Sequence, residues 1–277
     1  MQNIVAAIDF SKYSASVIHH AIGLSDHFKA RLFVFHAISF PRNEMYGTAS
    51  HNRSNAMDEE ISRVSARIDK LMKNSRAAWR SIIRFGDPVE EVVRFADELN
   101  ADLVVAASHG ISGWRRLLLG TVVERLARYL TRPLLVIRRS HLAENTTGFE
   151  LKHIVVGCDL TENAVTLLEN AVLMATSFNA ELHLVHAIEA PINTSIMDPT
   201  AAPYSEVQNA LLQRLTDRLQ RLIANCGNHT LTIRPVVLPG LPNEEILAYA
   251  ATMAADLIMV GVRKRQALEK WLIGSTT

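Results

Sequence analysis

The stretch NIVAAIDFS at residues 3–11 recurs as HIVVGCDLT at residues 153–161, at an offset of 150. The same offset pairs ARLFVFHAI, which ends at Ile38, with AELHLVHAI, which ends at Ile188. Farther along, the offset becomes 154, and GDPVEEVV from Gly86 aligns with GLPNEEIL from Gly240. A repeat of this extent indicates two consecutive copies of one structural module.

Short apolar runs alternate with amphipathic stretches within each copy. In the first copy, the apolar runs predict strands at residues 4–8, 32–38, 81–84, 103–107 and 134–137. Helical periodicity predicts helices at about residues 14–28, 59–73 and 120–130. Strands that alternate with helices form a parallel sheet with helices on both faces, because the crossovers are right-handed. We therefore expect an α/β fold with two tandem, doubly wound, five-stranded, Rossmann-like domains.

Capping signals mark the start of a fourth helix in the first copy. Asp87 is expected to be its N-cap, Pro88 its first helical residue and Glu90 its capping glutamate. The helical spacing predicts that its buried face consists of Val89, Val92, Val93 and Ala96.

The boundary between the copies is expected in a polar segment without periodicity. This gives a first domain at residues 1–140, a linker at 141–150 and a second domain at 151–277. The first copy continues for about 20 residues past Thr121, whereas the second ends at Thr277, two residues past Ser275. We therefore expect the second domain to lack the last helix and strand, so that its fourth strand is a sheet edge. A natural truncation and an incomplete sequence both fit this pattern.

The composition disfavours several classes of partner. The 277 residues include 29 basic and 28 acidic ones, so no net field would draw the chain onto nucleic acid or an anionic membrane. The first residues do not resemble a signal peptide, and no apolar run reaches the roughly 20 residues that a membrane span needs. The two cysteines, Cys158 and Cys226, favour a reducing compartment. We therefore expect a cytoplasmic protein.

Polar residues and glycines gather where a doubly wound sheet binds its ligands, outside the carboxyl ends of the strands. Asp9 follows the first strand, where its carboxylate can accept from a ribose hydroxyl, hold a cation, or merely cap the next helix. After the fourth strand come Gly110, nine further residues, and Gly120-Thr121 at a helix start. Glycine backbone and the free N–H groups of a helix start form a cradle for phosphate.

This glycine spacing resembles the G-x2-G-x9-G-[ST] signature of the universal stress protein family, and the resemblance extends over nearly the whole of both copies. Residues 113–137, GWRRLLLGTVVERLARYLTRPLLVI, are similar to that family's loop, last helix and last strand. The resemblance implies ATP, or ADP or AMP, bound with Mg²⁺, with adenine at the ends of the first two strands. One departure is Ala107, which stands where the family has its first glycine. The nucleotide-binding residues that the resemblance implies are Ala7, Ile8, Asp9, Ala37, Ala107, Ser108, His109, Gly110, Gly120, Thr121 and Val122.

The corresponding site of the second copy is expected to be degenerate. Lys264 replaces the middle glycine within a basic stretch, and lysine disfavours a positive φ angle and adds bulk. Alternatively, its ammonium group binds a phosphate as a point charge. The residues of this second candidate site are Asp159, Ala187, Gly261, Lys264, Gly274 and Ser275.

Other motifs of nucleotide enzymes do not occur. The chain has neither a GxxxxGK[ST] loop nor GxGxxG after its first strand, which disfavours P-loop NTPases and dinucleotide oxidoreductases. No nucleophile motif accompanies the histidines, so we assign no catalytic residue and expect ATP hydrolysis to be slow at most. His36 and His186 recur at a strand end and are expected to be packed or hydrogen-bonded, and we assign no metal site to the protein alone.

Three functions are compatible with these residues, in descending order. The first is an ATP-binding module with a role in stress response or signalling, and the second is a scaffold of the same fold that pairs without binding nucleotide. The third is an enzyme that acts on a small adenylated substrate. The family resemblance also implies that modules pair, either as a homo-oligomer or as a pseudo-dimer within the chain, with the strand at residues 134–137 as the candidate surface.

Overall fold

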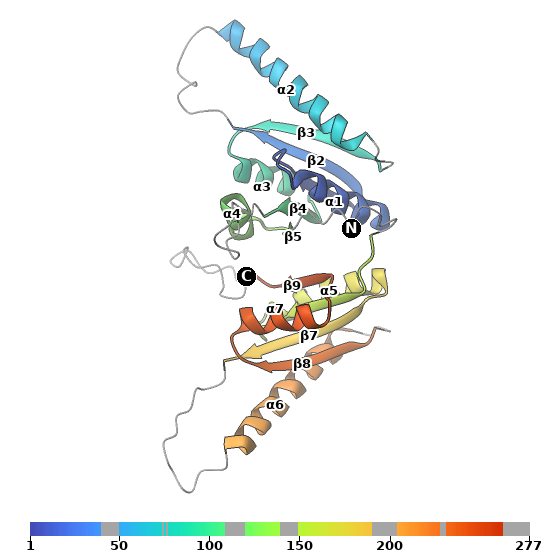
Figure 1. Cartoon of the computed structure of the whole chain (residues 1–277), viewed down its shortest axis with the longest axis vertical. Coiled ribbons are helices and arrows are strands. Elements are labelled where there is room, and N and C mark those ends of the chain that lie inside the picture. Colours follow the sequence, from blue (N-terminus) through green and yellow to red (C-terminus); the bar gives the residue numbers. More distant parts are fainter. Residues whose placement is uncertain are drawn as a thin grey trace. The chain divides into compact units, whose positions relative to one another are not determined.

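The computed structural model describes residues 1–39, 50–73, 75, 77–108, 120–138, 149–189, 204–227 and 231–262. The chain divides into two compact units, Met1–Phe149 and Glu150–Thr277 (Figure 1). Among the described residues, no helix combines the length and the apolar character that a bilayer crossing requires.

The first unit alternates strands with helices as the sequence predicts. Its five-stranded sheet has the order β3-β2-β1-β4-β5, and every pair of neighbours is parallel. The doubly wound fold is therefore confirmed. Its elements are β1 (Asn3–Ala7), α1 (Ser14–Phe28), β2 (Arg31–Ile38), α2 (Ser50–Met72), β3 (Trp79–Phe85), α3 (Pro88–Glu98), β4 (Leu103–Ala107), α4 (Thr121–Tyr129) and β5 (Leu134–Ile137).

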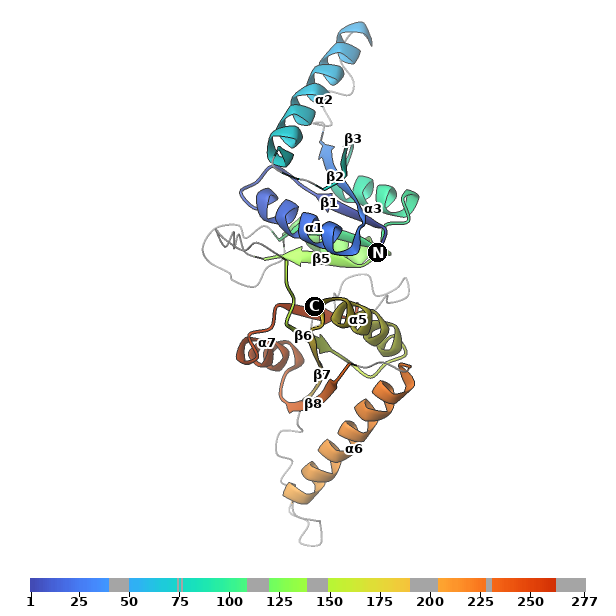
Figure 2. The ribbon, with the colours of Figure 1, turned by 90° about the vertical axis from the view of Figure 1, so that its right-hand side faces the viewer.

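The three central strands, β2, β1 and β4, are largely buried, which explains their nearly continuous apolar sequences. Val5, Phe35 and Ala106 belong to one core cluster, to which α3 contributes Val92 and α4 contributes Val123. Helices α1 and α2 cover the opposite face, as Figure 2 shows from the side. The main departure from the predicted boundaries is α2, which begins at Ser50 rather than near Glu59. Residues 50–58 are mostly polar, so apolar periodicity gives no sign of these first turns.

Asp87 is confirmed as the N-cap of α3. Asp87 Oδ1 accepts hydrogen bonds from the N–H groups of Val89 (3.0 Å) and Glu90 (3.1 Å), and a proline occupies the first turn. The Arg125 guanidinium on α4 donates to both carboxylate oxygens of Asp87, at 2.9 and 3.1 Å, and holds the pKa of that carboxyl below its usual value. The predicted buried face is correct except for Val93, which is only half-buried, while Phe95 is buried in addition.

The second unit repeats this arrangement with fewer described elements. Its sheet has four strands in the order β8-β7-β6-β9, so within the described part of this unit β9 pairs only with β6. This agrees with the prediction of a shorter second domain. Its elements are β6 (His153–Gly157), α5 (Ala164–Phe178), β7 (Glu181–Ile188), α6 (Tyr204–Asn225), β8 (Ile233–Pro239), α7 (Pro242–Thr252) and β9 (Leu257–Val260).

Candidate functional site

The carboxyl ends of three strands meet at one edge of the first sheet. β1 lies between β2 and β4, and its last residue, Ala7, is level with Phe35 on β2 and Ala106 on β4. The strand order reverses between β1 and β4, which is where open parallel sheets bind their ligands. The predicted residues Ile8, Asp9, Ala37, Ala107 and Ser108 all lie at the ends of these three strands.

Asp9 lies in an exposed turn just beyond β1. Its Oδ1 accepts hydrogen bonds from the Ser11 N–H at 2.9 Å and from the Ser14 hydroxyl at 3.2 Å. The alternative in which Asp9 is the N-cap of α1 is wrong, because Tyr13 occupies that position. Asp9 instead closes a short turn between strand and helix, which holds its carboxylate at the sheet edge.

The residue after Asp9, Phe10, packs against a histidine ring and an arginine side chain. Phe10 has a left-handed backbone, with φ at 59°, and its ring lies 4.6 Å from the His36 ring and 3.9 Å from the Arg67 guanidinium. His36 Nδ1 donates to the Ile8 carbonyl at 2.8 Å, which confirms the prediction of a hydrogen-bonded histidine. Sequence reasoning missed Phe10 and Arg67. Arg67 lies on α2, far from Phe10 in the sequence, so no local pattern predicts their contact.

The start of α4 presents backbone N–H groups for which the described residues provide no side-chain cap. Gly120 has extended angles, φ −60° and ψ 147°, and no described side chain caps the N–H groups that follow. Thr121 and Val122 are exposed, whereas Val123 packs into the core cluster against which Ala7 and Ala37 also pack. Free N–H groups and the helix dipole make such a start favourable for an anion. Its one first-turn acid, Glu124, is paired with Arg128 at 2.9 Å.

The end of β4 is buried. Ala107 is 9% exposed and Ser108 is 7% exposed, and the Ser108 N–H donates to the Ile137 carbonyl at 3.0 Å. The next two predicted residues, His109 and Gly110, lie outside the described residues.

The second domain repeats the turn after its first strand. Asp159 Oδ1 accepts from the Thr161 N–H at 3.1 Å and from the Thr161 hydroxyl at 2.6 Å. His186 Nδ1 donates to the Cys158 carbonyl at 2.7 Å, again as a hydrogen-bonded histidine, and burial raises the pKa of the Cys158 thiol. Ala187 is buried near the end of β7, and Gly261 is exposed after β9. The other predicted members, Lys264, Gly274 and Ser275, lie outside the described residues.

The second domain also holds a cluster that sequence reasoning missed. His153, Glu181 and His183 lie at the amino ends of β6 and β7, at the opposite edge of the sheet from the turn of Asp159. The three residues come from two strands that pair only in the folded sheet, and their one sequence signal is the alternate spacing of Glu181 and His183. Since the sequence predicts no metal site, this cluster is an addition to the predicted sites.

Comparison with known proteins identifies relatives of both domains. The profile described as the universal stress protein family matches residues 1–138 and 150–277. A universal stress protein of Methanocaldococcus jannaschii is 27% identical over 142 residues, covering 50% of this chain and 82% of its own length. The universal stress protein YxiE of Bacillus subtilis is 28% identical over 147 residues, covering 49% of this chain and 97% of its own.

Several solved structures match the whole chain. A universal stress protein from Archaeoglobus fulgidus superposes with a TM-score of 0.71 at 19% identity, covering 99% of this chain and 92% of its own. A protein from Pseudomonas aeruginosa described as a putative universal stress protein has a TM-score of 0.66 at 13% identity, covering 100% of this chain and 87% of its own. At these identities the likeness concerns the fold alone.

Proposed function

Because the chain belongs to the universal stress protein family, whose profile matches both halves, we propose that its first domain binds ATP or a related adenine nucleotide. The observation that carries this proposal is the start of α4, which no described side chain caps and whose Val123 packs into the core cluster that Ala7 and Ala37 contact. A phosphate group would receive hydrogen bonds from the N–H groups of Thr121 and Val122 and from the Thr121 hydroxyl. His109 and Gly110 would complete the cradle.

The remaining predicted residues would hold the nucleoside. Asp9 is exposed and fixed by its turn, so its carboxylate can accept from a ribose hydroxyl. The backbone of Ala37 would meet adenine, beside Ala7 and Ile8, while Ala107 and Ser108 line the approach to the phosphates. Mg²⁺ would neutralise phosphate charge, and it fits a site with a single carboxylate because it keeps several waters and binds phosphate oxygens directly.

This nucleotide binding would serve a stress-response or signalling role in the cytoplasm. The two cysteines are free, which agrees with a reducing compartment. Pairing through β5 fits the same picture, because β5 is an edge strand with half-exposed leucines, Leu134 and Leu135. The second domain would then contribute mainly to pairing, and its Lys264 site would hold no nucleotide.

The test is to purify the chain without added nucleotide, denature it, and measure the released adenine nucleotide by chromatography. We expect about one nucleotide per chain, its loss in Gly110→Lys, and its retention in Leu71→Lys, which adds the same charge to an exposed position on α2. Two nucleotides per chain, with one retained in Gly110→Lys, would overturn the assignment to the first domain alone. No nucleotide, and no binding on titration with ATP, would favour the pairing scaffold.

A further inference from the structure

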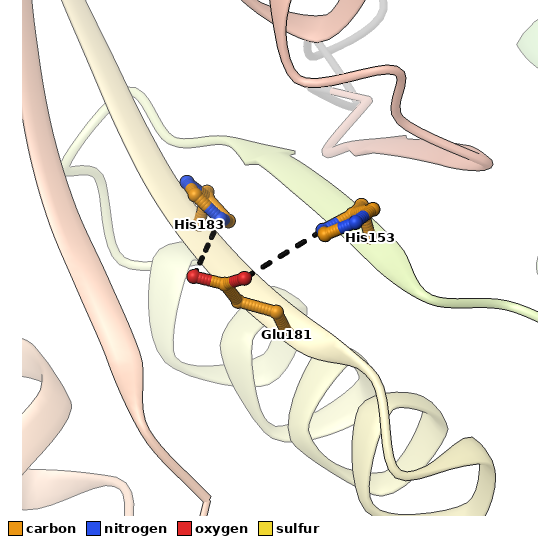
Figure 3. A group of neighbouring side chains, drawn as sticks. All are labelled: His153, Glu181 and His183. Carbon is orange, nitrogen blue, oxygen red and sulfur yellow. Dashed lines mark ion pairs between the residues drawn. The ribbon is translucent and has the colours of Figure 1, made fainter.

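Two histidines and a glutamate converge at the amino edge of the second sheet (Figure 3). His153 is the first residue of β6, and Glu181, the first residue of β7, is its partner in the strand pairing. His183 follows Glu181 by two residues, so both side chains project from the same face of β7. Figure 3 shows the Glu181 carboxylate facing both imidazole rings.

Within the described part of the chain, the nitrogens that face this carboxylate are near it but form no well-aligned hydrogen bond. His183 Nε2 lies 3.3 Å from Glu181 Oε1, and His153 Nδ1 lies 3.6 Å from Glu181 Oε2. Both nitrogens are buried, and neither makes a hydrogen bond with any described residue. His183 is only 1% exposed, so water cannot easily satisfy its Nε2. A buried polar atom without a partner is costly, which points to a group that binds between these side chains.

The spacing suits a small divalent metal ion. In a tetrahedral zinc site with bond lengths of about 2.0–2.1 Å, neighbouring ligand atoms lie about 3.3 Å apart. The separation of 3.3 Å between His183 Nε2 and Glu181 Oε1 matches this value, and that of 3.6 Å between His153 Nδ1 and Glu181 Oε2 is slightly longer. One ligand atom from each of the three residues lies within 4.8 Å of the other two, so small side-chain movements would bring them to a shared ion. Two imidazoles and one carboxylate are a donor set that zinc commonly accepts, with water in the fourth position.

Neighbouring groups orient the ligands. The Tyr249 hydroxyl on α7 lies 2.7 Å from His183 Nδ1, so this nitrogen can donate to it and leave the Nε2 lone pair facing Glu181. Asp256 Oδ2 accepts from the His153 N–H at 3.0 Å and so fixes the start of β6.

One cation already contacts the cluster. Arg234, on β8, forms an ion pair with Glu181 Oε1. Its side chain is 62% exposed, so it can turn into solvent when a metal ion takes its place beside the carboxylate. This exchange would lower the affinity for the metal, because the ion pair must be broken first.

We propose that His153, Glu181 and His183 bind a divalent transition-metal ion, with zinc as the best match, at the amino edge of the second sheet. This site is separate from the nucleotide site and does not depend on it. The first domain has no equivalent, since Asn3, Arg31 and Phe33 stand at the three positions. The metal would therefore be a feature of the second domain alone.

The test uses the full chain without a histidine tag, stripped with a chelator and titrated with zinc chloride by calorimetry. We expect the unaltered chain to bind about one zinc ion. The affinity for zinc should fall more than about 100-fold in His183→Phe and about 10-fold in Tyr249→Phe. Arg234→Gln should bind more tightly than the unaltered chain. His27→Asn, which removes an exposed histidine from α1, should bind as the unaltered chain does.

The visible absorption of bound Co²⁺ provides a second readout, which reports the coordination of the metal directly. Co²⁺ in a tetrahedral His/Glu site absorbs strongly in the visible range, and this absorption should appear in the unaltered chain and in His27→Asn but not in His183→Phe. No zinc binding, or equal binding by the unaltered chain and His183→Phe, would overturn the proposal. Equal weakening in all variants, His27→Asn included, would also overturn it, because it would indicate nonspecific binding.

Discussion

Phe33 and Phe95 in the first domain occupy the positions that His183 and Tyr249 occupy in the second. The two phenyl rings lie 5.8 Å apart, edge to face, and the histidine and tyrosine rings lie 5.6 Å apart. The same strand and helix thus bring two rings together at nearly the same distance in both copies, but one pair is apolar and the other is joined by a hydrogen bond. The shared backbone fold brings the two side chains of each pair together. Whether the pair belongs to the apolar core or forms a polar site depends only on the identity of the side chains.

Exchange of these pairs should have the largest effect on stability. Phe33→His would remove packing from a side chain that is 7% exposed and bury an imidazole without its partner, so we expect the free energy of unfolding to fall by about 3 kcal/mol. Adding Phe95→Tyr should recover about 1 kcal/mol, because it restores the hydrogen bond of the second domain. Urea unfolding of the full chain, with hydrogen exchange to locate the change, measures both. Equal stability of Phe33→His and the unaltered chain would contradict this expectation.

The start of the third helix gives a second contrast. Asp87 caps α3, whereas Leu241 stands at the start of α7, where no described side chain forms a cap. Asp87→Ala should destabilise the first domain by about 1.5 kcal/mol, mostly through the lost cap, since the Arg125 pair is partly exposed and contributes less. Faster amide exchange at the start of α3, with α7 unchanged, would identify the effect. A shift confined to α7 would be inconsistent with it.

The reverse change should stabilise the second domain. Leu241 is 47% exposed, so Leu241→Asp removes little packing and supplies a cap for α7. We expect a gain of about 1 kcal/mol in the free energy of unfolding, measured by the urea midpoint of the second domain. Leu241→Asn should give a similar gain without the charge. If Asn gives none, the dipole rather than the cap is responsible.

The smallest effect concerns pH. His20 Nδ1 donates to the Ser16 carbonyl at 2.8 Å, and at the corresponding place in the second domain Asn170 Nδ2 donates to the Thr166 carbonyl at 2.9 Å. Burial, partly beneath Phe149, lowers the pKa of His20 below its ordinary value of 6.5. As the pH falls, His20 is therefore protonated in the unfolded chain before it is protonated in the folded chain. The free energy of unfolding decreases from about pH 6.5 down to the folded pKa of His20 and stays lower below it.

His20→Asn copies the second domain and should flatten this part of the stability profile without altering it above pH 7. Urea midpoints of both proteins between pH 5 and pH 8 measure the difference, since the carboxylates contribute equally to each. Parallel profiles would show that His20 is not the titrating group.

Much of the fold was predictable because its signals are local. The strands at 103–107 and 134–137 and the helix at 14–28 have the predicted bounds, since apolar runs and helical periodicity mark both ends. Asp87 was recognisable as a cap because its bonds reach only two and three residues along the chain. The family resemblance, carried by the repeat and the glycine spacing, is confirmed over both copies.

Contacts between distant segments could not be predicted. The partner of Asp87, Arg125, lies 38 residues away, and Arg67 contacts Phe10 from α2. The cluster of His153, Glu181 and His183 needs the register of β6 against β7, which no single strand reveals. Ile8, Asp9 and Ala37 lie at or just beyond the ends of β1 and β2, and the apolar runs of the sequence do predict these strand ends.

The double contact of Arg125 with Asp87 has a mechanical consequence. Two hydrogen bonds between the Arg125 guanidinium and the Asp87 carboxylate restrict rotation as well as separation of the two groups. They therefore tie α4 to the N-cap of α3. Any movement of α4 relative to α3 would have to break or stretch both of these hydrogen bonds. In the second domain the hydrocarbon side chain of Leu241 cannot accept such bonds, and no described side chain ties the start of α7 to another helix in this way.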